Sequence, residues 1–135
     1  MFSITMLYAQ SNEDCQMCHS DDELTTVRKG RTISLYVNEA VFNASVHGDL
    51  ECVNCHYDAD VDEFPHPEML EKVSCGNCHG DAQEKFMEGI HGIALERGAA
   101  YAPTCEECHG EHDILPPSDV NSRTYKMRTN STMTM

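Results

Sequence analysis

The hydrophobic residues of this chain occur in short runs between polar and charged loops, and residues 82–97 have the clearest helical pattern. Two neighbouring rows of residues at four-residue spacing run along this stretch: Phe86, Ile90 and Ala94, then Met87, His91 and Leu95. Such rows lie on one face of an α-helix, so we expect His91 on the buried face. Asp81 is the predicted N-cap of this helix, and Glu84 stands where it completes a capping box.

A second pattern, rich in β-branched residues, predicts one β-hairpin. Its strands are expected over residues 24–27 and 32–37, on either side of the turn Arg28-Lys29-Gly30-Arg31. Three of the nine basic residues of the chain crowd this turn. The turn is either a docking point for a partner or an ordinary solvated turn, and we favour the solvated turn.

Two shorter helical segments complete the predicted secondary structure. Asn38 caps a short helix over residues 39–46, and residues 68–73 begin a helical turn. The length of 135 residues fits one compact domain. The predicted fold is therefore mainly α-helical, with much irregular structure and one small β-hairpin.

All eight cysteines belong to four copies of one pentapeptide, Cys-x-x-Cys-His. Two thiols three positions apart lie on one side of a helical turn, where each can form a thioether to a vinyl group of the same haem, and the adjacent imidazole then meets the iron. Zinc sites and thiol redox sites also use Cys-x-x-Cys, but zinc gives no reason for a histidine after every second cysteine. The repeats therefore predict four covalently bound haem c groups, attached at Cys15, Cys18, Cys52, Cys55, Cys75, Cys78, Cys105 and Cys108 and ligated through iron by His19, His56, His79 and His109.

The four histidines outside these motifs match the haems in number. A haem iron with one protein histidine needs a second axial ligand or leaves a site open for chemistry. We expect each spare histidine to be such a ligand: His47, His66, His91 and His112. Met69 and Met87 are the competing thioether ligands, although both are expected to pack on porphyrin as soft apolar residues.

The positions of these histidines limit how they can be paired with haems. His112 lies only three residues after His109, while the two axial ligands of one iron stand on opposite faces of a porphyrin. We therefore expect His112 to serve a haem other than that of His109, and His47 to serve the first haem. Gly89 and Gly92 flank His91 and would let a flat porphyrin approach.

The composition leaves little for an ordinary core. The chain has no Trp, four Phe and five Tyr, so porphyrin faces would have to supply apolar surface, and the chain without haem is expected to be largely disordered. Four haems in one small domain must also lie close together. Because electron tunnelling weakens exponentially with distance, such packing permits fast transfer between haems.

The formal net charge of −14 excludes one class of partner and favours another. Nucleic acid binding needs a basic face, which this composition does not provide. A positively charged redox partner, or a mineral or metal-ion acceptor, fits electrostatic steering, and the alternative is that the charge serves only solubility. Residues 21–23 and 58–63 are acidic clusters that we interpret as solvated charge rather than calcium sites.

We divide the sequence into three parts. Residues 1–10 are interpreted as the remnant of a secretory signal peptide, with cleavage after Ala9. Residues 11–120 form the tetrahaem domain. Residues 121–135 are a polar tail that is either disordered or the start of a truncated segment. No run of 18 apolar residues occurs, so no membrane-spanning helix is expected in this chain.

Four stretches resemble the multihaem c-type cytochromes of the tetrahaem, cytochrome c554-like group: Ser45-Val46-His47-Gly48, His66-Pro67, Ile90-His91-Gly92 and Cys108-His109-Gly110-Glu111-His112-Asp113-Ile114. The resemblance implies a haem-packed multihaem cytochrome fold, with bis-histidine haems in closely stacked pairs. It also implies electron transfer in respiration, anaerobic respiration included. Since c-type cytochromes acquire their haem outside the cytoplasmic membrane, it implies a periplasmic or extracellular location.

The predicted function is thus that of an electron carrier without catalytic residues. Its expected partners are other redox proteins, such as a reductase or a membrane quinol dehydrogenase, and further cytochromes. The main competing hypothesis is a multihaem reductase of nitrogen oxyanions or hydroxylamine, which needs an open iron, to be sought at the second or third haem near His66. The sequence is also compatible with a membrane-bound quinol-oxidising cytochrome, with a subunit of a haem filament, and with the N-terminal part of a larger multihaem cytochrome.

Overall fold

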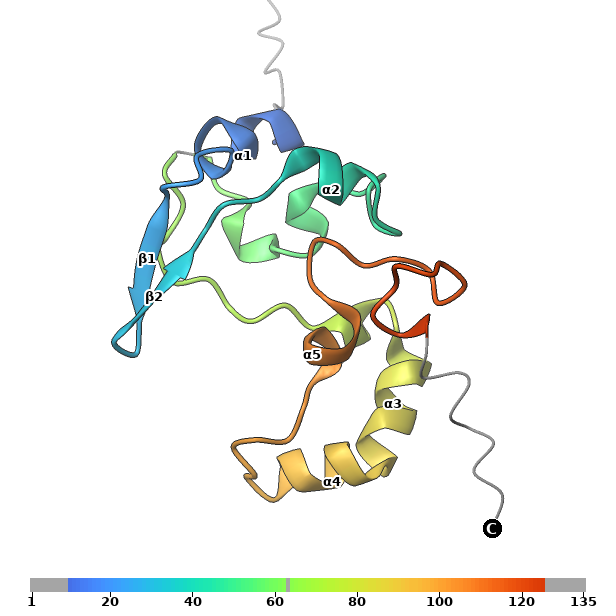
Figure 1. The fold of residues 1–135 in the computed structure, drawn as a ribbon. Helices are drawn as coiled ribbons and strands as arrows, with labels where there is room; N and C mark the ends of the chain where they lie inside the picture. The colour runs from blue at the N-terminus through green and yellow to red at the C-terminus, as the bar shows by residue number, and fades with distance from the viewer. Residues whose placement is uncertain (1–9, 63, 126–135) are drawn as a thin grey trace, which may run out of the picture. The chain divides into compact units, whose positions relative to one another are not determined.

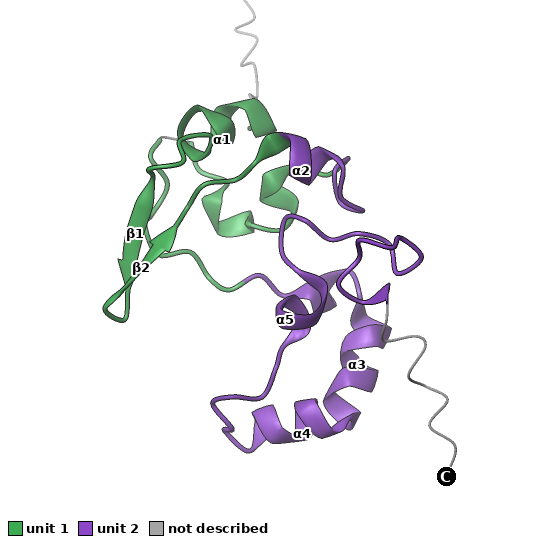
Figure 2. Cartoon of the chain, viewed as in Figure 1, with its two compact units in different colours: residues 1–39, 50–72 green, residues 40–49, 73–135 purple. Residues whose placement is uncertain are grey.

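The computed structural model describes residues 10–62 and 64–125 of the chain (Figure 1). The predicted signal-peptide remnant, apart from Gln10, and residues 126–135 of the predicted tail lie outside the described residues. The chain forms two compact units (Figure 2). Unit 1 consists of Met1–Glu39 and Leu50–Lys72, and unit 2 consists of Ala40–Asp49 and Val73–Met135.

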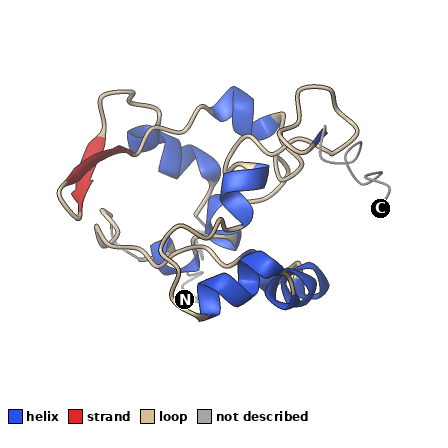
Figure 3. Cartoon of the chain, turned by 60° about the horizontal axis from the view of Figure 1, so that its bottom comes forward, coloured by secondary structure: helices blue, strands red, loops and turns tan. Residues whose placement is uncertain are grey.

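Unit 1 contains the β-hairpin, which confirms the sequence prediction. Strand β1 (Thr25–Arg28) pairs antiparallel with β2 (Arg31–Ser34), and Arg28 lies opposite Arg31. Lys29 and Gly30 form the two-residue turn with φ values of 50° and 74°, as the tight hairpin turn that matches strand twist requires. Figure 3 shows this pair in red, the one strand pair of the described residues, among helices and long loops.

Three helical segments complete unit 1. They are α1 (Asn12–His19) and the two 3₁₀ turns η1 (Cys52–Asn54) and η2 (Tyr57–Ala59). The helical turn predicted over residues 68–73 does not form. The backbone N–H of Glu71 is instead donated to the carboxylate of Asp58 at 2.5 Å, which ties this segment to η2.

Helix α2 (Glu39–Asn43) begins at the last residue of unit 1 and continues into unit 2. It ends three residues before the predicted end at residue 46. The reason is a contact distant in sequence, because the N–H of Val46 is donated to the carbonyl of Ile114 at 2.9 Å. This hydrogen bond fixes the backbone just before His47 to a segment beside His112.

The rest of unit 2 contains the 3₁₀ turn η3 (Cys75–Asn77) and the helices α3 (Gly80–Glu88), α4 (Ile90–Glu96) and α5 (Cys105–His109). The prediction of one continuous helix over residues 82–97 was wrong. Gly89 has an extended backbone with ψ of 169° and separates α3 from α4. Helix α3 also begins one residue before the predicted cap, directly after His79.

The break at Gly89 changes the roles expected for residues around it. His91 lies exposed on α4 rather than on a buried face, because the two helical rows no longer continue in phase. Gly92 is buried, and a Cβ atom there would collide with the backbone of Met87. Gly92 therefore permits the close turn between α3 and α4. The space that a side chain would fill at this position is occupied by protein backbone.

Side chains alone provide almost no core. Ala59 is the single buried hydrophobic residue of the described part of the chain, and none of its side chains is fully buried. Large apolar side chains are instead exposed, among them Met17 at 75%, Ile90 at 79% and Tyr101 at 99%. In the segments described, no helix combines the length and the apolar character needed to cross a membrane.

Gly92→Ala should destabilise the folded protein by about 1–3 kcal/mol, because the added methyl group overlaps the Met87 backbone. Gly80→Ala is the matched control, since a Cβ at this first residue of α3 meets nothing within 4 Å. It should be neutral or stabilise by about 0.5–1 kcal/mol, because alanine loses less backbone entropy. Thermal unfolding of the haem-loaded variants measures both, and equal effects would contradict the assigned role of Gly92.

Candidate functional site

Each of the four Cys-x-x-Cys-His motifs lies on a helical turn, as the spacing predicts. The first lies in α1 and the fourth forms α5. In the second and third, the N–H of the histidine is donated to the carbonyl of the first cysteine, at 2.9 Å in both His56 and His79. This i to i−4 hydrogen bond brings both cysteines and the histidine onto one turn, which is the arrangement that covalent haem attachment needs.

Three of the motif-bearing turns begin with a capping residue pair that the sequence reasoning missed. The N–H of Ser11 is donated to Asp14 at 2.9 Å, that of Glu51 to Asn54 at 2.9 Å and that of Thr104 to Glu107 at 2.6 Å. Two of these pairs have the Ser/Thr-x-x-acid spacing typical of a capping box, so the signal was present at Ser11 and Thr104. The caps fix where each turn starts and thereby orient the first cysteine of its motif.

In unit 1 the imidazole of His19, the histidine of the first motif, lies opposite that of His66. The ring centres are 6.0 Å apart and the ring planes differ by 3°. His19 donates Nδ1–H to the carbonyl of Leu35 at 2.6 Å, and Nδ1 of His66 lies 2.8 Å from the carbonyl of Pro67. These hydrogen bonds engage the Nδ1 atom of each ring, so the Nε2 atoms remain as the nitrogens able to bind a metal.

In unit 2 the imidazole of His79, from the third motif, faces that of His47. Their ring centres are 5.9 Å apart and their planes differ by 54°. This arrangement differs from the expectation that His47 serves the first haem. His47 and His79 lie 32 residues apart in the sequence, so their proximity is a contact between distant residues that local sequence spacing does not reveal.

The remaining two spare histidines of unit 2 are placed differently. His91 is exposed on α4. The ring of His112 makes an edge-on contact with Phe42, with centres 6.3 Å apart and planes at 73°.

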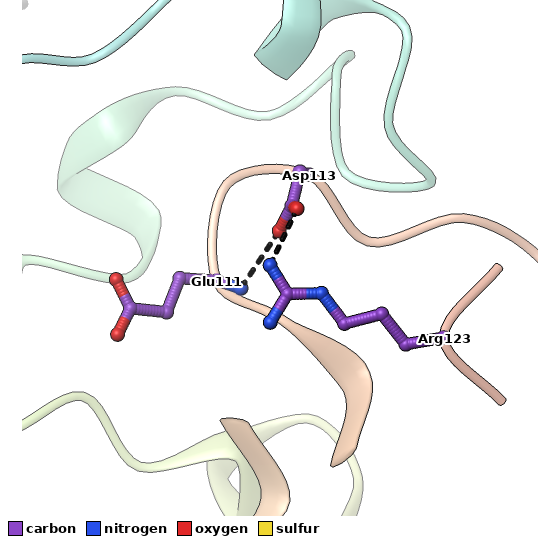
Figure 4. Close-up of polar contacts among 3 residues, drawn as sticks. All are labelled: Glu111, Asp113 and Arg123. Carbon is purple, nitrogen blue, oxygen red and sulfur yellow. Dashed lines mark hydrogen bonds and ion pairs between the residues drawn. The ribbon is translucent and has the colours of Figure 1, made fainter. Parts of the chain in front are cut away.

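An ion pair anchors the segment next to His112 (Figure 4). The Arg123 guanidinium is 2.7 Å from the Asp113 carboxylate, which also accepts the backbone N–H of Glu111 at 3.3 Å. The hydrogen bond from Arg123 holds the pKa of the Asp113 carboxyl below its ordinary value. The Asp113 side chain is 42% exposed, so we regard the pair as a local tether of this loop rather than a large contribution to stability.

The first cysteines of two motifs meet in each unit. The side chains of Cys15 and Cys52 are neighbours in unit 1, and those of Cys75 and Cys105 are neighbours in unit 2. Burial, and then the neighbouring Cys15 thiol, raise the pKa of Cys52 to about 12. Burial, and then Cys75, likewise raise the pKa of Cys105. Both contacts bring together groups from separate haem motifs.

The geometry of the described residues fits haem. A bond from a metal to an imidazole nitrogen is about 2 Å long, so imidazoles on opposite sides of one iron have ring centres roughly 6 Å apart. Both imidazole pairs have this separation. Among residues 10–62 and 64–125, no group of three or more His, Cys, Asp or Glu side chains gathers in the manner of a protein-bound metal ion. The nearly absent side-chain core is also consistent with a prosthetic group that contributes apolar surface.

A protein family model described as cytochrome c7 and related cytochrome c matches residues 40–110. The matched segment covers more than half of the chain and contains the second, third and fourth Cys-x-x-Cys-His motifs, together with His47, His66 and His91. Comparisons with curated proteins and with solved structures gave no match. The chain therefore belongs to the family of cytochrome c7 and related cytochromes c, and it is a multihaem electron-transfer protein with covalently bound haem c.

Proposed function

We propose that this cytochrome carries four haem c groups, each with two axial histidines, and passes single electrons between respiratory redox partners outside the cytoplasmic membrane. The observation that carries the proposal is the pair formed by His19 and His66. Its imidazoles are parallel, 6.0 Å apart, and hydrogen-bonded through Nδ1 to backbone carbonyls. Two imidazoles at this separation, each with its Nδ1 already engaged, would suit the two axial positions of one haem iron.

When bound, haem c supplies a one-electron couple between ferrous and ferric iron. The chain sets the conditions for that couple. Donation of Nδ1–H from His19 to the Leu35 carbonyl makes the imidazole a stronger electron donor at Nε2, which favours the ferric state. The negative field of a chain with net charge −14 acts in the same direction. Both effects support low reduction potentials.

A second ligand set follows for the third motif. We assign His47 as the partner of His79, because the ring separation of 5.9 Å matches that of the first pair. We assign His91 to the haem of His109, since His112 lies too close in sequence to reach the opposite face of that haem. His112 is then the ligand of a haem other than that of His109.

The proposed partners follow from charge and from the class of protein. An electron carrier needs a donor and an acceptor, and we propose a membrane quinol dehydrogenase, a reductase or a further cytochrome in these roles. The 23 acidic residues against nine basic ones favour partners or acceptors with a cationic docking surface. A periplasmic or extracellular location completes the proposal.

Replacing His66 with Gly should convert one haem of the loaded protein from low spin to high spin in the ferric state, because its iron loses one axial ligand. Added imidazole should restore the low-spin signal by filling the vacated position. Electron paramagnetic resonance and absorption spectra measure the spin state, and intact mass gives the number of attached haems. His47→Gly should act in the same way on a different haem, so the double variant should contain two high-spin haems.

Met69→Leu is the matched control, because Met69 is the nearby competing ligand and its side chain is 70% exposed. It should leave the ferric spectrum unchanged. A high-spin haem in Met69→Leu but not in His66→Gly would overturn the assignment of His66. A high-spin haem in the unmodified protein that binds nitrite or cyanide would instead favour a multihaem reductase.

Because the chain is acidic, the rate of electron exchange with small reagents should depend on salt concentration, in opposite directions for cationic and anionic reagents. Oxidation of the reduced protein by a cationic complex such as hexaammineruthenium should slow as salt rises, and oxidation by anionic ferricyanide should accelerate. Between roughly 0.01 M and 0.1 M salt the screening length falls from about 30 Å to about 10 Å, so this interval should contain most of the change. Stopped-flow absorbance gives both rates. If both oxidation rates changed in the same direction with salt, the negative charge of the chain would not act at the sites of electron exchange.

A further inference from the structure

In unit 1 a single residue joins the starts of the first two haem-binding turns. Asn12 is the first residue of α1, and its side-chain amide reaches the segment that opens η1. Its Oδ1 accepts the N–H of Cys52 at 2.7 Å, and its Nδ2 donates to the carbonyl of Leu50 at 3.0 Å. Its own backbone N–H is donated to the Glu51 carboxylate at 3.1 Å. The amide thus pairs with the backbone carbonyl of Leu50 and the backbone N–H of Cys52, the two sequence neighbours of Glu51.

This contact ties together the segments that carry the first cysteines of both motifs. Cys15 follows Asn12 by three residues in α1, which is close to one helical turn, while Cys52 is held directly through its backbone N–H. The side chains of Cys15 and Cys52 are neighbours, so the attachment points of the first and second haems would lie close together. Caps formed by Ser11 with Asp14 and by Glu51 with Asn54 fix each turn separately. Asn12 is the link that fixes one turn against the other.

We propose that Asn12 is a positioning residue that sets the mutual geometry of the first and second haems, and with it the rate of electron exchange between them. The inference rests on the proposed function, since it takes haem to be attached at both motifs. A thioether at each cysteine would attach a haem, so the neighbouring side chains of Cys15 and Cys52 would hold the two haems close together. The haems would supply one-electron couples that exchange an electron without proton transfer or bond breaking, and Asn12 would act only by setting where the two cysteines lie.

The chemistry of the Asn12 amide makes a sharp test possible. Asn12→Ala removes both side-chain hydrogen bonds. Asn12→Asp retains an acceptor for Cys52 N–H but places a negative oxygen against the Leu50 carbonyl, so it should loosen the link only in part. Asn121→Ala is the matched control, because the Asn121 amide makes a local bond to Asp119, two residues away in unit 2.

The experiment uses the haem-loaded protein of each variant. Intact mass first establishes that all haems remain attached, and the ferric spectrum that they remain low spin. Electron exchange within the pair is then measured by flash reduction and by nuclear magnetic resonance of the partly reduced protein. In Asn12→Ala we expect the exchange rate between the first two haems to fall by roughly tenfold or more, because small misplacements are costly where geometry limits a transfer step. Asn12→Asp should lie between Asn12→Ala and the unmodified protein, and Asn121→Ala should match the unmodified protein.

Exchange between the haems attached at Cys75 and Cys105 serves as an internal reference, since Asn12 belongs to the other unit. A lower melting temperature of Asn12→Ala with unchanged exchange between the first two haems would overturn the inference, because it would reveal a stabilising role alone. An equal fall in both pairs would also overturn it. If Asn12→Ala does not mature, Asn12→Asp decides the question. Failure of the proposed function is recognised separately, as missing or high-spin haem in the unmodified protein.

Discussion

The separation of about 6 Å between facing imidazoles is the constraint on which this structure depends. It is met twice, by His19 with His66 and by His47 with His79, and each pair joins segments distant in sequence within one unit. Side-chain packing does not hold these segments together, because Ala59 is the single buried hydrophobic residue in the described part of the chain. A backbone hydrogen bond joins Val46, the residue before His47, to Ile114 in the same unit. With so little side-chain packing, each unit would gain order from haem bound between its paired imidazoles, as small metal-dependent domains do from their metal.

The parts of the structure that were predictable from the sequence are those governed by local rules. Cys-x-x-Cys-His spacing places its ligands on one helical turn wherever it occurs, and the hairpin follows from a two-residue turn ending in Gly30. The local errors also have local causes. Gly89 ends a helix that the apolar rows alone would continue, because glycine has a low helix propensity. The capping pairs at Ser11 and Thr104 also follow a local rule, since their spacing in the sequence is typical of a capping box.

The pairing of histidines was not predictable, and the reason is physical. His47 precedes the second motif by only five residues, yet it faces His79, which belongs to the third motif. Proximity along the chain therefore does not determine proximity in space for a ligand in a loop. The role of Asn12 was not predictable for the same reason. A polar residue at the start of a helix is common, and only the fold places Leu50 and Cys52 beside this one.

The two imidazole pairs differ in one respect that has consequences for the electronic structure of the iron. The ring planes of His19 and His66 are nearly parallel, at 3°, whereas those of His47 and His79 are turned by 54°. Parallel planes let both π-donor orbitals overlap the same d orbital of an iron between them, which separates it in energy from its perpendicular partner. Turned planes divide the donation between the two orbitals and bring their energies closer. In the proposed ligation, the two iron sites would therefore differ in magnetic anisotropy although their ligands are chemically alike.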